Sequence, residues 1–103
     1  MDERIVVHID PDLEELIPGF LANRGKDVGA MREALARDDF DRIRISGHSM
    51  KGAGGGYGFD AITEIGARIE QAAIARDASA VSSGVDALVD YLGRIDVVYD
   101  GES

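Results

Sequence analysis

A histidine and a lysine three residues apart, His48 and Lys51, are the side chains of this chain best suited to chemistry. They lie in the segment GHSMKGAGGGYG, residues 47–58, in which six of twelve residues are glycine. Neutral imidazole is a competent nucleophile, and histidine is largely neutral at cytoplasmic pH. A phosphoryl group on its nitrogen would carry negative charge close to the Lys51 ammonium group. The pair therefore indicates phosphoryl transfer, which depends chiefly on positioning and charge neutralisation.

The element that must position these side chains follows from the spacing of small and apolar residues. Around His48 they recur at alternating steps of three and four, which is typical of one face of an α-helix. The stripe consists of Phe40, Ile43, Gly47, Met50, Gly54 and Tyr57. It predicts a helix over about 40–57 whose stripe faces a core. At about 100° per residue, His48 lies about 130° from the middle of the stripe and therefore points outward.

The expected outer face of this helix carries further candidate functional residues. Gly52 and Gly55 share the face with His48, and they would leave room for the active site of another protein to approach. Lys51 lies at the edge of the face, one turn after His48. The candidate docking residues on or beside this face are Arg44, Ile45 and Ser49. The two glycines within the inner stripe are expected to allow close packing against a neighbouring helix.

Similar stripes predict the rest of an all-α fold. Besides the helix at 40–57, a short helix is expected at about 10–17 and longer ones at about 18–37, 60–76 and 78–99. Aspartates stand where N-caps are expected, at Asp10, Asp39, Asp60 and Asp77. Because the connections are short, neighbouring helices should be antiparallel. The sequence thus predicts an antiparallel up-down four-helix bundle with a short extra N-terminal helix, extended residues 1–9 and a frayed tail at 100–103.

Length and composition are those of one domain. The chain has 103 residues, 45% of them hydrophobic, so we expect a single domain over residues 1–103 with its core between about 10 and 99. A net charge of −9 argues against nucleic-acid binding, and the lack of cysteine excludes disulfides and thiolate chemistry. No apolar run is long enough to span a membrane, and no signal peptide is visible. We expect a cytoplasmic monomer without membrane contact.

The segment around His48 resembles the signature of a known family. His48-Ser49-Met50-Lys51-Gly52, with Gly58 ten residues after the histidine, is similar to the H-x-x-K-G-x-x-x-x-x-G pattern of histidine phosphotransfer (HPt) domains. The resemblance covers roughly residues 10–99, including the order and the lengths of the expected helices. One departure is the run Gly54-Gly55-Gly56, where the family often has serine, alanine or asparagine.

The resemblance implies a function and a role for each matching residue. It implies a four-helix bundle, not an enzyme, that accepts a phosphoryl group on histidine and exchanges it with an aspartate of a response-regulator receiver domain. The implied partners are such a receiver and a sensor histidine kinase. By position, His48 would be the phospho-acceptor, Lys51 would neutralise charge, Gly52 would clear the contact surface and Gly58 would form the helix-ending turn. No cofactor is implied, and Mg²⁺ is expected only on the partner receiver domain.

Other interpretations keep the helical shape without the phosphoryl group. One is a non-phosphorylated helical adaptor that docks on receiver domains or other partners, and another is a kinase-associated domain cut from a longer chain. Nucleotide-binding loops are excluded, because Ala53 stands where a P-loop needs lysine and the glycine spacing misses the dinucleotide pattern. His8, near Asp10 and Asp12, is interpreted as a packed or solvated side chain before a helix cap, and no metal site is expected.

Overall fold

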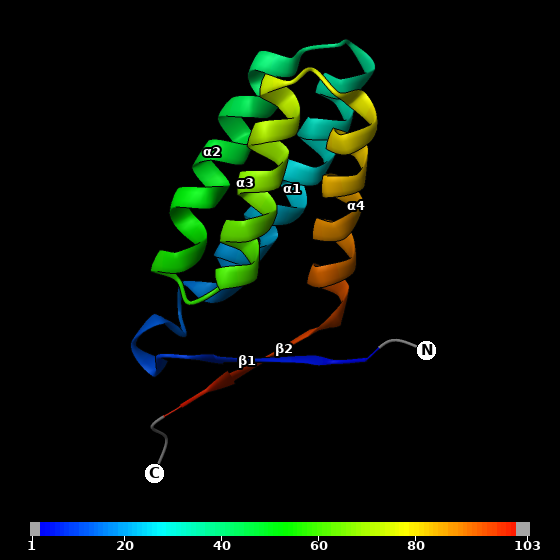
Figure 1. The fold of residues 1–103 in the computed structure, drawn as a ribbon. Coiled ribbons are helices and arrows are strands. Elements are labelled where there is room, and N and C mark those ends of the chain that lie inside the picture. Colours follow the sequence, from blue (N-terminus) through cyan, green and yellow to red (C-terminus); the bar gives the residue numbers. More distant parts are fainter. Residues whose placement is uncertain (1–2, 101–103) are drawn as a thin grey trace.

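The computed structural model describes residues 3–100 as a bundle of four helices with a small sheet at one end (Figure 1). In chain order the elements are strand β1 (Ile5–Ile9), a 3-10 helix (Pro11–Leu13), α1 (Ile17–Ala36), α2 (Phe40–Gly56), α3 (Asp60–Ile74), α4 (Ala78–Arg94) and strand β2 (Ile95–Tyr99). The helices expected at 18–37, 40–57 and 60–76 are confirmed to within two residues at each end. None of the helices within residues 3–100 has the length and the apolar character needed to cross a bilayer.

Side-chain caps begin two of the four helices. Asp39 accepts a hydrogen bond from a backbone N–H in the first turn of α2, and Asp77 does the same for α4, as expected. Each bond satisfies a backbone donor that a helix leaves unpaired at its start. The cap expected at Asp60 is wrong. Phe59 holds the cap position of α3 without a side-chain bond, because Asp60 is already the first helical residue.

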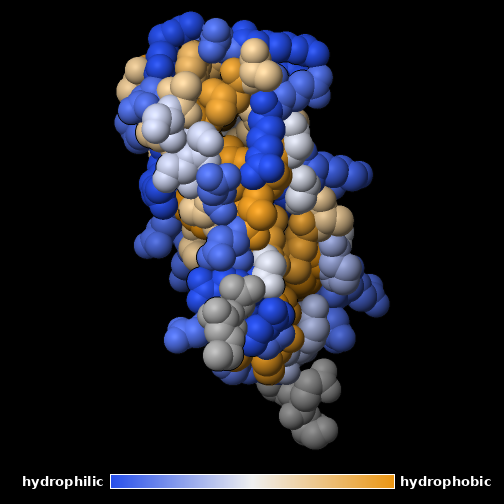
Figure 2. All heavy atoms as spheres, turned by 90° about the vertical axis from the view of Figure 1, so that its right-hand side faces the viewer, coloured by the Kyte–Doolittle hydropathy of each residue, from blue (hydrophilic) through white to orange (hydrophobic). Residues whose placement is uncertain are grey.

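The core lies between the helices and extends to the sheet. In α2 the buried residues are Phe40, Ile43, Gly47, Met50 and Gly54, as the stripe predicts. Towards the sheet, the Phe20 ring of α1 stacks on Phe59, with ring centroids 5.4 Å apart. Figure 2 shows apolar atoms running lengthwise between polar side chains on the α4 side of the molecule. Burial of apolar surface is the main stabilising contribution to folding. The buried stripe of α2 therefore fixes the rotation of that helix about its axis.

The two strands form a parallel sheet that joins the first and last elements of the described chain (Figure 1). In its register, Ile5 pairs with Ile95 and Ile9 pairs with Tyr99. Side chains of a strand alternate between its two faces, so Ile5, Val7 and Ile9 all pack against the core. The extended conformation expected for residues 1–9 is confirmed over Ile5–Ile9, and residues 1–2 lie outside the described residues.

The all-α expectation is wrong where the sheet forms. The helix expected at 78–99 ends at Arg94, and residues 95–99 continue as β2. This segment is rich in β-branched residues, which lose side-chain freedom in a helix and fit the surface of a sheet well. In so short a segment the apolar residues fit both the steps of three and four of a helix and the alternation of a strand. Pairing with β1 selects the strand.

The extra N-terminal helix expected at 10–17 is reduced to the 3-10 helix Pro11–Leu13. Asp10 caps it as expected, by accepting a hydrogen bond from the backbone N–H of Asp12. At the other end of the chain, Asp100 was expected to fray but is held by β1. Its backbone N–H donates to the carbonyl of Ile9 over 3.0 Å, and its carboxylate lies 2.8 Å from Nδ1 of His8. The rest of the expected tail, residues 101–103, lies outside the described residues.

Candidate functional site

His48 lies in the middle of α2 and points to solvent. Its side chain is 68% exposed, whereas its neighbours Gly47 and Met50 are buried. The outward orientation expected from the helical stripe is therefore confirmed. The helix itself is set in place by the Asp39 cap at its start and by the buried stripe along its inner face. The ring is thus presented by a rigid element rather than by a loop.

A carboxylate from the neighbouring helix holds both candidate residues of α2. Glu70 of α3 is only 11% exposed, and its Oε2 atom lies 2.9 Å from Nδ1 of His48. Its other oxygen, Oε1, lies 2.9 Å from Nζ of Lys51. Sequence reasoning missed Glu70 altogether. The available signal was a charged residue on the packed face of α3, because Gly66 and Ala73, one turn before and after Glu70, are small and buried.

The charge on Glu70 decides which ring nitrogen of His48 is free. The hydrogen bond from Lys51, and then that from His48, hold the pKa of the Glu70 carboxyl below its usual value despite the opposing effect of burial. An ionised carboxylate only accepts hydrogen bonds, so Nδ1 of His48 must be the donor. In the neutral ring the other nitrogen, Nε2, then keeps its lone pair. The site therefore presents an oriented nucleophile, with an ammonium group one helical turn away.

The glycines of the second half of α2 leave its outer surface open. A β-carbon added at Gly52 or Gly56 would meet nothing within 4 Å. One added at Gly55 would meet only the Thr63 hydroxyl oxygen, at an ordinary contact distance of 3.6 Å. Gly58 follows the end of α2 with φ of +89°, in the left-handed region that favours glycine. The helix thus ends in a turn that a residue with a β-carbon would strain.

Comparison with known proteins identifies the family. The family model of the Hpt domain matches residues 15–97. The chain belongs to the Hpt domain family. Members of this family are phosphocarrier modules that interact with kinases and receiver domains in two-component phosphorelays. No curated protein and no solved structure gives a significant match to the chain.

The remaining candidate residues surround His48 on the surface of this Hpt domain. Arg44 and Ser49 are exposed on α2, and the Ile45 side chain is an exposed large hydrophobic residue at 60%. The structure adds a residue that the sequence analysis did not single out: Ile74 of α3, one turn beyond Glu70, is 55% exposed. Isolated apolar residues are common on protein surfaces, and Ile45 and Ile74 are two such residues, one on each of the helices that form the site.

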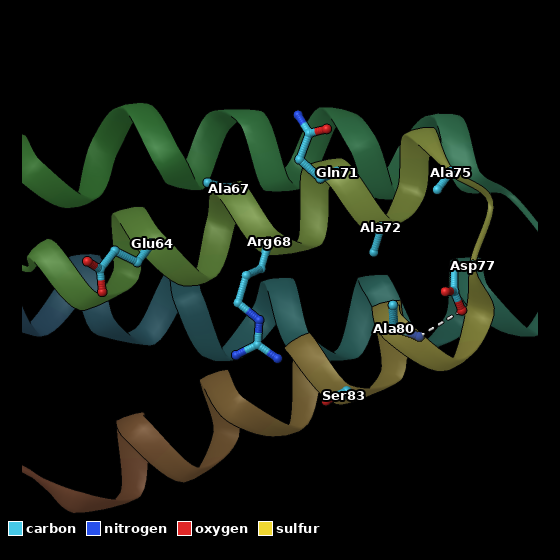
Figure 3. A pocket seen from close by; sticks show the side chains of 9 residues that line it. All are labelled: Glu64, Ala67, Arg68, Gln71, Ala72, Ala75, Asp77, Ala80 and Ser83. Carbon is cyan, nitrogen blue, oxygen red and sulfur yellow. Dashed lines mark hydrogen bonds between the residues drawn. The ribbon is translucent and has the colours of Figure 1, made fainter.

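A hollow of the Hpt domain lies away from this site, between α3 and α4. It has a volume of about 660 Å³. Figure 3 shows its lining, with the Arg68 side chain reaching from α3 toward α4. The lining residues are Glu64, Ala67, Arg68, Gln71, Ala72, Ala75, Asp77, Ala80 and Ser83. They include neither His48 nor Lys51, so the candidate chemistry takes place on an open helix face and not in this hollow.

Proposed function

We propose that this Hpt domain carries a phosphoryl group on Nε2 of His48 and exchanges it with the aspartate of a response-regulator receiver domain. The observation that carries the proposal is the contact of 2.9 Å between Glu70 and Nδ1 of an otherwise exposed ring. This contact leaves Nε2 as the nitrogen with a lone pair, directed to where a partner protein can approach. Family membership supports the same reaction class.

In the transfer, the Nε2 lone pair forms a bond to the phosphorus of the receiver's phosphoaspartate. The bond between phosphorus and the aspartyl oxygen breaks at the same time, and the aspartate leaves as a carboxylate. No proton has to move, because the Nδ1–H stays hydrogen-bonded to Glu70 while the ring gains positive charge. The Lys51 ammonium group offsets the negative charge of the phosphoryl group. The reverse reaction uses the same atoms.

Partner docking uses the open surface around His48. Gly52 and Gly55 give the receiver's active site access to the ring, and Ile45, with Arg44 and Ser49, supplies side-chain contacts. The contact should be small and transient, since only a limited patch surrounds the histidine. The receiver supplies the Mg²⁺, and a sensor histidine kinase is the original phosphoryl donor. The cytoplasmic location and the monomeric state stay predictions.

The test is phosphoryl uptake from a phosphorylated receiver domain. We expect acid-labile label on the wild-type chain and none on His48→Gln, because glutamine cannot form the phosphorus–nitrogen bond. His8→Gln is the matched control, since it removes the other histidine of the chain and should keep full labelling. Label that persists in His48→Gln would contradict the proposal. Binding of the receiver that is indifferent to His48→Gln, without any label on wild type, would favour the alternative of a non-phosphorylated adaptor.

A further inference from the structure

The helices that form the site touch backbone to backbone. A β-carbon added at Gly66 of α3 would lie 2.6 Å from the backbone nitrogen of Lys51 and 2.8 Å from the carbonyl oxygen of Gly47. One added at Gly47 would lie 2.8 Å from the backbone nitrogen of Glu70 and 2.9 Å from the carbonyl oxygen of Gly66. Real β-carbons essentially never approach other atoms so closely. Neither position therefore accepts a larger residue without a shift of one helix relative to the other.

A third contact continues this seam along the helices. Gly54 of α2 lies against Thr63 of α3, where an added β-carbon would be 2.6 Å from the Thr63 backbone nitrogen. The Thr63 hydroxyl also donates a hydrogen bond of 3.1 Å to the carbonyl oxygen of Lys51. Gly47 lies against Gly66 and Glu70, whereas the later Gly54 lies against the earlier Thr63, so α2 and α3 run antiparallel. Glycine thus sets the separation of α2 and α3 over the whole length of the site.

The small separation determines what the Glu70 side chain can reach. Glu70 follows Gly66 by one helical turn, and Lys51 follows Gly47 by one turn, so the four residues form one cluster. Within it the carboxylate contacts both His48 and Lys51 at 2.9 Å. A hydrogen bond that lengthens to about 3.6 Å is effectively lost. A shift of less than 1 Å between the helices is therefore enough to release the histidine.

We propose that Gly47 and Gly66 are positioning residues for phosphoryl transfer: their backbone contact places the Glu70 carboxylate where it keeps the proton of His48 on Nδ1. This inference rests on the proposed function for its rate effects, but its geometric part concerns the free protein alone. A methyl group at position 66 moves α3 away from α2. The imidazole is then free to carry its proton on Nε2, and that nitrogen no longer has a free lone pair for attack on phosphorus.

The decisive variant is Gly66→Ala, studied by nitrogen-15 NMR of the imidazole rings at mildly alkaline pH. We expect His48 of the wild type to show a protonated Nδ1, and Gly66→Ala to shift the ring toward the tautomer protonated on Nε2. His8, which is hydrogen-bonded to Asp100 beside the sheet, is the internal reference, and its tautomer should not change. Gly84→Ala is the matched control. Its added carbon would meet the Ile69 side chain at 2.7 Å, where α3 packs against α4 rather than against α2, and it should leave the His48 tautomer as in wild type.

Transfer rates provide the second measurement. Gly66→Ala should slow phosphoryl uptake by a factor on the order of tenfold to a hundredfold, as expected for a misplacement of this size. In a Glu70→Ala background the same substitution should have no further effect, because it acts through Glu70. A folded Gly66→Ala protein with the wild-type tautomer would overturn the proposal. So would an equal effect of Gly66→Ala with and without Glu70.

Folding is controlled separately. Gly47→Ala serves as a second variant, because its added carbon meets the same helix contact from α2. Gly66→Ala and Gly47→Ala are both prepared in sucrose, which favours the compact state. If neither variant folds even there, the glycines serve the fold rather than the site and the proposal fails. The tautomer measurement involves no phosphoryl group. Its outcome therefore stays distinct from that of the labelling test on His48→Gln, which decides the proposed function.

Discussion

At the residue scale, Glu70 uses one carboxylate for two tasks. One oxygen fixes the orientation of the His48 ring, and the other holds the Lys51 ammonium group in reach of the same surface. The carboxylate is largely buried, and its two contacts offset the cost of removing a charge from water. Truncating it would release both partners at once. The effects of Glu70 and Lys51 substitutions on transfer should therefore not be additive.

The lowered pKa of Glu70 predicts a loss of stability in acid. A carboxyl whose folded pKa lies below its ordinary value of 4.5 contributes stability above that value, and this contribution is lost as the pH falls through the folded pKa. We therefore expect Glu70→Gln to lose less free energy of unfolding than wild type when the pH falls from about 5 to about 3. Urea unfolding of both proteins at each pH measures the free energy of unfolding.

Asp96→Asn serves as a parallel variant for the acid measurement. The hydrogen bond from Arg4 lowers the pKa of the Asp96 carboxyl, so this variant should also have a flatter acid profile than wild type. A Glu70→Gln protein that loses as much stability as wild type over the same range would show that the carboxylate does not contribute in this way.

The residue scale also shows what sequence reasoning can and cannot find. His48, Lys51 and Gly52 follow from local spacing, because a helix fixes the relation of residues three and four apart. Glu70 is 22 positions from its histidine partner, and their contact depends on how closely two helices approach. That approach depends on Gly47 and Gly66, whose effect becomes visible only when both backbones are placed together.

At the scale of elements, the aspartate caps carry a second prediction. Asp39→Ala and Asp77→Ala should each lower the free energy of unfolding by about 1 kcal/mol, since each leaves a backbone donor at a helix start unpaired. Asp60→Ala is the control, because Asp60 does not cap α3 and should cost clearly less. Chemical denaturation of the three variants measures these losses of free energy of unfolding. Equal losses in all three would contradict the assignment of the caps.

The four long helices were predictable because their apolar residues repeat over several turns. The segment after Arg94 was not, since these five residues, apolar except for Asp96, are too few to distinguish a helix from a strand. What decides its conformation is β1, which begins about 90 positions earlier and offers a strand edge with matching alternation. The same long-range pairing holds Asp100, which local reasoning assigned to a frayed end.

At the scale of the whole molecule, Ile9 connects the sheet to the bundle. It is fully buried, and its Cδ1 atom would be only 2.9 Å from a β-carbon added at Gly58 beyond α2. We expect Ile9→Ala to lower the free energy of unfolding by about 2–5 kcal/mol, as other large-to-small substitutions in cores do. Val6→Ala, in the same strand but exposed, should cost much less. Similar losses in both variants would show that the sheet does not pack as described.

The parallel direction of β1 and β2 has a mechanical consequence. The start of β1 and the end of β2 lie at opposite ends of the little sheet, so a pull applied through Ile5 and Tyr99 acts along the strands (Figure 1). Tension in that direction loads all the hydrogen bonds between the two strands together, in shear, instead of breaking them one after another. A partner tethered to either end would therefore pull against these hydrogen bonds before any force reached the helix that bears the histidine.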